Sequence, residues 1–194
     1  KAGALKAPVK IIEERVVGPS LGEDSIRRVV TTSVISFAIV ILFMLAYYAL
    51  GGGVADVALL MNVLLVVAAL AAFGGTLTLP GIAGIILSVA MAVDANILVF
   101  ERIREEMAAG RTLKAAVEQG YAKAMSAIID SNITHILSSI VLIYLGTGPV
   151  KGFALTLIIG VVMTLFTAVL VTRAIFEIII AGGATTFNFG QKKA

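Results

Sequence analysis

Long apolar runs separated by short glycine-rich or charged segments dominate the chain. The runs cover residues 29–50, 54–73, 80–100, 125–145 and 153–180, and the breaks lie at 51–53, 74–75, 101–124 and 146–149. Each run has about the twenty residues that a helix needs to cross the hydrocarbon core of a bilayer. Helices satisfy their own backbone hydrogen bonds in lipid, whereas membrane strands alternate polar and apolar residues over about ten positions. The pattern therefore predicts an all-α membrane protein with five transmembrane helices.

Composition supports this class and narrows the chemistry. Hydrophobic residues make up 59% of the 194 residues, charged residues make up 14%, and the mean hydropathy is +1.05. These values exclude an ordinary soluble domain. The chain has no cysteine, which excludes disulfides and thiolate metal sites. The net charge of +3 is spread over the loops without a basic cluster, so we expect no nucleic-acid partner, and we expect no metal and no cofactor.

The polar segments set the expected domain organisation. Residues 1–28 open without a start methionine or a signal-peptide core, so we expect a piece of a longer polypeptide. Lysine and arginine near the span ends favour the cytoplasmic side for the 101–124 loop and the 181–194 tail. The prediction is an extracytoplasmic segment 1–28, a transmembrane domain 29–180, and a cytoplasmic loop and tail. Within the loop, Gly110 should end one helix and Thr112 should cap the next.

An aspartate lies close to the middle of the third apolar run. Burying a carboxylate at this depth costs roughly 2.5 to 3.5 kcal/mol, and an intramembrane acid is a functional-site hypothesis by default. Counting at about 1.5 Å per residue places Asp94 and Asp130 at similar depths on their helices, with His135 further out. Acids and an imidazole staggered across a bilayer are typical of a proton relay, because each has two protonation states. Asp94, Asp130 and His135 are therefore the candidate proton-coupling residues.

Structural interpretations of the same side chains stay open. A single histidine in a membrane helix also serves as a hydrogen-bonding helix contact, and this is the alternative for His135. The alternative for Asp130 is a wetted position near the cytoplasmic interface. Asp56 begins the second helix, where the helix dipole favours an anion, so no function is needed to explain it.

Small and polar residues recur at every fourth position in three of the runs. The longest stripe consists of Gly152, Thr156, Gly160, Thr164, Ala168 and Thr172, and the shorter ones of Gly84, Ser88, Ala92 and Asn96, and of Ser126, Asp130, Thr134 and Ser138. Small residues at this spacing let membrane helices approach closely and hydrogen-bond across the contact. We therefore expect helix packing at Asn96, Asn132, Thr134, Gly152 and Gly160.

Four motifs, in order and correctly spaced, resemble one family of membrane proteins. They are EERVVGPSLG at 13–22, LPGIAGI at 79–85, AVDANILVFERIREE at 92–106 and GTGPVKGFA at 146–154. From Ala2 to Ile180 the chain is similar to SecD of the SecD/SecF family of protein-export components, and it resembles SecF less. This family has the resistance-nodulation-division (RND) type of transporter fold, so the resemblance implies half of an RND-type transmembrane bundle.

The resemblance also implies roles and partners. The five helices would be the second to sixth of six spans, and 1–28 would return from a large extracytoplasmic domain. Asp94 would be the proton-coupled aspartate, facing the SecF half. The implied partners are SecF, the SecYEG channel, YajC, the exported preprotein and membrane lipid, in the bacterial cytoplasmic membrane. The family usually reads DANITT where this chain reads DSNITH at 130–135, so His135 replaces a threonine and no role carries over to it.

The expected function is a proton-motive-force-driven component of Sec-dependent protein translocation. Such a component moves protons and transmits force to the preprotein without making or breaking covalent bonds, so we do not expect an enzyme. One alternative is a passive scaffold subunit of the translocon, in which the acids only form hydrogen bonds. The other is half of an RND-type efflux or lipid exporter, which would need a substrate cavity.

Overall fold

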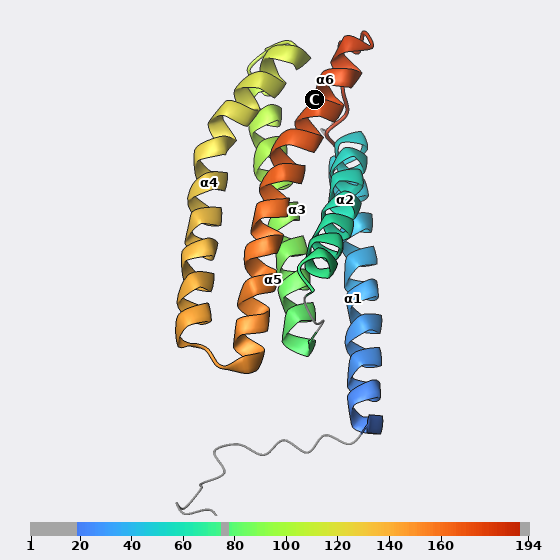
Figure 1. Ribbon diagram of the computed structural model, residues 1–194. Coiled ribbons are helices and arrows are strands. Elements are labelled where there is room, and N and C mark those ends of the chain that lie inside the picture. The colour runs from blue at the N-terminus through green and yellow to red at the C-terminus, as the bar shows by residue number, and fades with distance from the viewer. Residues whose placement is uncertain (1–18, 75–77, 191–194) are drawn as a thin grey trace, which may run out of the picture.

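A computed structural model describes residues 19–74 and 78–190, with side chains from residue 24 onward (Figure 1). The expected segment 1–28 therefore lies mostly outside the described residues, as does the end of the tail. The elements are α1 (Pro19–Tyr48), α2 (Leu50–Ala72), α3 (Leu79–Ala108), α4 (Leu113–Leu145), α5 (Gly148–Leu165), the π-helical turn η1 (Phe166–Val171) and α6 (Thr172–Ala181). No strand occurs among these residues.

The all-α prediction with five spans is confirmed. Five helical segments are long and apolar enough to cross a membrane, and α5, η1 and α6 together form the fifth. In Figure 1, α6 continues the line of α5, while α1 and α4 stand at opposite edges of the bundle. The α1 span is only 6% buried within the chain, because it lies at the edge beside α2.

The charged segment 101–124 is almost entirely helical. The helix α3 continues past its apolar run to Ala108, and α4 begins at Leu113. Gly110 takes a φ of +82° in the turn between them, a conformation that suits a residue without Cβ. The Thr112 hydroxyl accepts a hydrogen bond from the Ala115 N–H, as an N-cap does. The predicted stop and cap are thus confirmed, and the segment consists of two helix ends joined by a short turn.

The first break does not lie at the three glycines. The chain turns at Ala49, with a φ of +49°, and residues 51–53 belong to the first turn of α2. A Cβ on Gly52 would lie 2.0 Å from the Met44 carbonyl oxygen, and one on Gly51 would lie 2.7 Å from the Phe189 ring. These glycines therefore allow close approach to α1 and to the tail, rather than breaking the helix.

Asp56 is a second departure from expectation. It lies beyond the first turn of α2, which contains no acidic residue, so the helix dipole does not account for it. The residue is 7% exposed, and neither carboxylate oxygen has a hydrogen-bond partner among the described residues. Asp56 is thus an acid enclosed within the bundle.

The C-terminal tail closes one end of the bundle. The Gly51 N–H donates to the Asn188 carbonyl at 3.2 Å, which ties the tail to the start of α2. Phe189 is 1% exposed and packs against Phe100 of α3 and Phe176 of α6, with ring centroids 5.6 and 5.5 Å away. The aromatic cluster therefore fixes the relative positions of α2, α3 and α6 at this end.

Candidate functional site

Asp94 lies on the side of α3 that faces α4, next to a cavity of about 300 Å³ between the two helices. From α3 the cavity is lined by Met91, Asp94 and Leu98, and from α4 by Ser131 and His135 among others. Asp94 is exposed in the chain by itself, and within the described part of the protein its carboxylate makes no hydrogen bond or ion pair. The five helices therefore leave this intramembrane acid accessible.

His135 is the titratable group that α4 contributes to the same cavity. Its Nδ1 lies 2.6 Å from the Ser131 carbonyl oxygen, one turn earlier on the helix. A carbonyl can only accept, so Nδ1 carries the proton, and in the neutral ring Nε2 is left as an acceptor. The cavity thus combines a carboxylate with an imidazole, and both groups can bind and release a proton.

Asn132 adds a buried amide to the cavity lining. It is 4% exposed, and its Nδ2 donates to the Ile128 carbonyl at 2.7 Å within its own helix. Its Oδ1 has no partner among the described residues. A buried amide oxygen without a donor is available to a protonated group or to water.

The structure does not bring Asp130 to this site. Asp130 is exposed and does not line the cavity, whose α4 residues are Ala127, Ile128, Ser131, Asn132 and His135. Thr134 is also exposed, and its hydroxyl donates to the Asp130 carbonyl at 2.9 Å within the same helix. The two acids, which residue counts place at similar depths, therefore do not share the cavity, because the 126–138 stripe lies on another face of α4.

The opposite face of α3 is packed tightly against α5 and α6. A Cβ on Gly160 would lie 2.3 Å from the Ser88 Cβ, and one on Gly152 would lie 3.3 Å from the Thr78 hydroxyl oxygen. Asn96 is 1% exposed, and its Oδ1 accepts a hydrogen bond from the Thr172 hydroxyl at 3.1 Å. This face positions α3, and through it Asp94, against the fifth span.

A buried polar network lies next to this contact, and it was not predicted from the sequence. The Asn62 amide of α2 donates to the hydroxyls of Thr164 and Thr167 at 3.3 and 3.2 Å. The Thr164 hydroxyl lies 3.4 Å from the Ser88 carbonyl oxygen of α3 and donates to it. Thr167 lies in the π-helical turn η1, an irregularity that is frequent at functional sites. The available signal was Asn62 itself, a fully buried amide in the middle of an apolar run.

Charged contacts hold the ends of α3 and α4 together outside the apolar runs. Glu106 of α3 is 5% exposed and forms ion pairs with Lys123 of α4 and, at 2.6 Å, with Arg111. The hydrogen bond from Lys123, together with the charges of Lys123 and Arg111, holds the pKa of the Glu106 carboxyl below its usual range. These pairs, together with the close approach of Gly120 to Ile103, join α3 and α4 beyond the cavity.

Within residues 19–74 and 78–190, no group of three or more histidine, cysteine, aspartate or glutamate side chains could hold a metal ion. The cavity residues instead suit proton binding.

Comparison with known proteins identifies the family. Residues 2–181 match the family model for the protein export membrane protein SecD/SecF, C-terminal. The chain is 59% identical over 177 residues to the protein translocase subunit SecD of Syntrophobacter fumaroxidans, covering 91% of this chain and 33% of that protein. It is 55% identical over 180 residues to SecD of Desulfurispirillum indicum, covering 93% of this chain and 35% of that protein. The chain therefore spans about a third of the length of these relatives.

Solved structures agree with this assignment. The crystal structure of SecDF, a translocon-associated membrane protein from Thermus thermophilus, superposes with a TM-score of 0.84 at 40% identity. The match covers 87% of this chain and 24% of that chain. SecDF in the super-membrane-facing form matches with a TM-score of 0.83, also at 40% identity, over 96% of this chain and 25% of the other. This chain is a multi-pass membrane protein that belongs to the SecD/SecF C-terminal family of protein export membrane proteins.

Proposed function

We propose that this chain is the membrane part of a SecD-type protein-export component that couples proton movement to translocation, with Asp94 as the proton-binding residue. The observation that carries the proposal is the accessible Asp94 carboxylate beside a cavity that also contains His135. The names of the relatives support a role in protein export. The proposed activity is transport without covalent catalysis, so the chain is not proposed to be an enzyme.

The coupling follows from the two protonation states of Asp94. A charged carboxylate at this depth must contact water or a donor, whereas a neutral acid tolerates a dry contact. Proton binding therefore favours closure of the cavity between α3 and α4, and proton release favours its hydration. Because α3 is packed tightly against α5 on its other face, such a change would displace α4 or a partner more readily than α5.

A partner is expected on the face that carries Asp94. Membrane acids avoid lipid by facing protein or a water-filled cavity, and this chain leaves Asp94 exposed. We propose that a SecF half covers this face, and that SecYEG, YajC and the preprotein are the wider partners. The charge bias near the span ends supports an extracytoplasmic N-terminal segment and a cytoplasmic turn between α3 and α4.

The test is preprotein translocation into membrane vesicles, with and without a proton gradient, at matched expression. We expect Asp94→Asn to leave folding and partner assembly intact and to abolish stimulation by the gradient, because the amide cannot release a proton. Asp94→Glu should retain part of the stimulation, since the ionisable group survives in a displaced position.

Asp130→Asn is the matched control for this test. It makes the same chemical change on a face of α4 that does not line the cavity. Stimulation should therefore stay close to that of the wild type. Full stimulation with Asp94→Asn would show that the proton path runs elsewhere, and loss of partner assembly in that variant would assign Asp94 to a scaffold role.

A further inference from the structure

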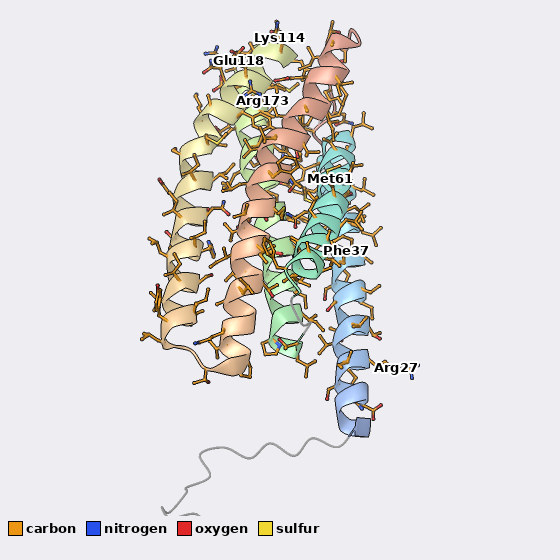
Figure 2. The ribbon with its side chains drawn as sticks, in the orientation of Figure 1. Arg27, Phe37, Met61, Lys114, Glu118 and Arg173 are labelled. Carbon is orange, nitrogen blue, oxygen red and sulfur yellow. The ribbon has the colours of Figure 1, made fainter. Side chains whose placement is uncertain are left out.

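A second cavity, of about 410 Å³, lies between α4 and α6 at the end of the bundle where the tail docks. Lys114 and Glu118 of α4 line it on one side, and Arg173 and Glu177 of α6 on the other. Figure 2 shows Lys114, Glu118 and Arg173 together at this end, far from Arg27 at the opposite end. We propose that this cavity binds the headgroup of a zwitterionic aminophospholipid, of which phosphatidylethanolamine is the probe. The inference does not depend on proton coupling.

Contacts across the bundle place the cavity at the border between apolar and charged residues. Phe176 of α6 packs edge-on against Phe100 of α3, with ring centroids 5.9 Å apart. Phe100 is the last residue of the third apolar run, and Glu101 follows it. Arg173 and Glu177 flank Phe176 and thus lie near the level where α3 leaves its apolar run. This is the level at which the headgroups of a bilayer are expected.

The cavity contains charges that the fold leaves unused. Arg173 is occupied in part, because its Nε donates to Glu177 at 2.9 Å and its guanidinium lies 5.9 Å from the Tyr121 ring centroid. Lys114 and Glu118, by contrast, make no hydrogen bond or ion pair within the part of the chain that the structure describes. They are four residues apart on α4, so they are neighbours on one helix face.

This pair of charges fits an ethanolamine phosphate. The phosphate can accept from the Lys114 ammonium and from the remaining N–H groups of Arg173, which form charge-assisted hydrogen bonds. The ammonium, two carbons from the phosphate ester oxygen, can donate to the Glu118 carboxylate. A choline headgroup has no N–H to donate, and a glycerol headgroup brings no cation for Glu118. Basic pockets between membrane helices bind lipid headgroups. In this cavity the Glu118 carboxylate favours a headgroup that carries both a phosphate and an ammonium.

Apolar residues in the same cavity suit the rest of the lipid. Val117 of α4 and Ile180 and Ala181 of α6 complete the lining. Ile178, beside Glu177, is 71% exposed on the outer surface of α6. An acyl chain lying against this surface would bury apolar area that the chain alone leaves open. This favours a lipid over a soluble phosphate ester as the occupant.

The experiment measures lipid retained by the purified protein in detergent micelles, using native mass spectrometry. Phosphatidylethanolamine, phosphatidylcholine and phosphatidylglycerol with identical acyl chains are offered at equal concentrations. We expect the wild type to retain phosphatidylethanolamine preferentially. Lys114→Ala should weaken that retention by about tenfold, the loss expected when one hydrogen bond to a charged group is removed. Glu118→Gln should abolish the preference over phosphatidylglycerol.

Arg27→Ala removes an exposed cation at the opposite end of the bundle and should leave retention unchanged. Unchanged retention with Lys114→Ala, or equal retention of all three lipids by the wild type, would overturn the proposal. Displacement of the lipid by an equal concentration of free phosphoethanolamine would overturn it as well, because a soluble phosphate ester would then be the ligand. Circular dichroism of each variant distinguishes these outcomes from misfolding.

Discussion

The two faces of α3 differ in whether their polar side chains have hydrogen-bond partners. On the face toward α5 and α6, Gly160 of α5 lies so close to Ser88 that a single added carbon would clash, and Asn96 is paired across the contact with Thr172 of α6. On the face toward α4, a cavity of about 300 Å³ separates the helices, and the Asp94 carboxylate makes no contact with a polar group of the described chain. One helix thus has a closed face and an open face.

The difference indicates where the molecule is rigid and where it can move. Close backbone approach and interhelical hydrogen bonds stabilise membrane helix pairs, since lipid provides no hydrophobic drive between them. The pair formed by α3 and α5 has both features beside the cavity. The helices α3 and α4 approach each other closely beyond the cavity, where a Cβ on Gly120 would lie 2.9 Å from the Ile103 nitrogen and Glu106 forms its ion pairs. Movement linked to Asp94 is therefore expected on the α4 side, with α3 and α5 acting as one unit.

The largest effect is expected from adding one carbon to the closed face. In Gly160→Ala the new Cβ would lie 2.3 Å from the Ser88 Cβ, well inside van der Waals contact, so the helices must separate. We expect a loss of about 2 kcal/mol in the free energy of unfolding, within the range for overpacked interiors. The measurement is reversible unfolding of the purified protein in mixed micelles.

Two controls sharpen this result. Gly148→Ala makes the same change at the start of α5, where a Cβ would meet nothing within 4 Å. Ala127→Leu adds three carbons at the cavity on the open face. Both should change the free energy of unfolding by less than about 0.5 kcal/mol. If Gly160→Ala is as stable as these controls, the distinction between the two faces of α3 fails.

A smaller effect, of opposite sign, is expected at Asp56 of α2. This acid is 7% exposed, and neither carboxylate oxygen has a partner in the described chain. A buried polar group without a hydrogen bond costs about 1 to 3 kcal/mol, and more if it is charged. Asp56→Asn removes the ionisable group at nearly constant volume, so the free energy of unfolding at neutral pH should rise by about 1 kcal/mol.

The control for Asp56 is an exposed acid. Glu118→Gln makes the same type of change on the surface of α4 and should leave unfolding unaffected. A drop in stability with Asp56→Asn would indicate that the carboxylate has a stabilising partner, and would contradict the prediction.

The sequence predicted the helices well and the faces of the helices less well. Runs of apolar residues define spans without tertiary information, and the four-residue stripe of α5 predicted the close contact that Gly160 makes. The sequence did not reveal that Asp130 lies outside the cavity, because residue counts give depth along a helix, whereas the direction of a side chain depends on which neighbour α4 packs against. The glycines at 51–53 were interpreted as a break because a close approach by Met44 or Phe189 cannot be derived from local sequence.

The smallest predicted effect compares two asparagines that the sequence treated alike. Asn96 and Asn132 are both buried, and each donates from Nδ2 to the carbonyl four residues earlier, at 3.1 and 2.7 Å. They differ in the amide oxygen. The Asn96 Oδ1 accepts a hydrogen bond from the Thr172 hydroxyl, whereas the Asn132 Oδ1 has no partner within the described residues. Replacement by alanine should therefore cost more at Asn96, by the value of one interhelical hydrogen bond.

That value is expected to be about 0.6 kcal/mol, the average for such bonds in membrane proteins. The lower part of the range applies because Thr172 has a single hydroxyl proton, which is shared between Asn96 Oδ1 and the Thr167 carbonyl oxygen at 3.0 Å and can turn fully to that carbonyl when Asn96 is removed. A double-mutant cycle with Thr172→Val isolates the term. Coupling of Thr172 to Asn96 but not to Asn132 is the expected result, and equal coupling to both would mean that the closed face of α3 and the cavity beside α4 do not differ in their hydrogen bonding.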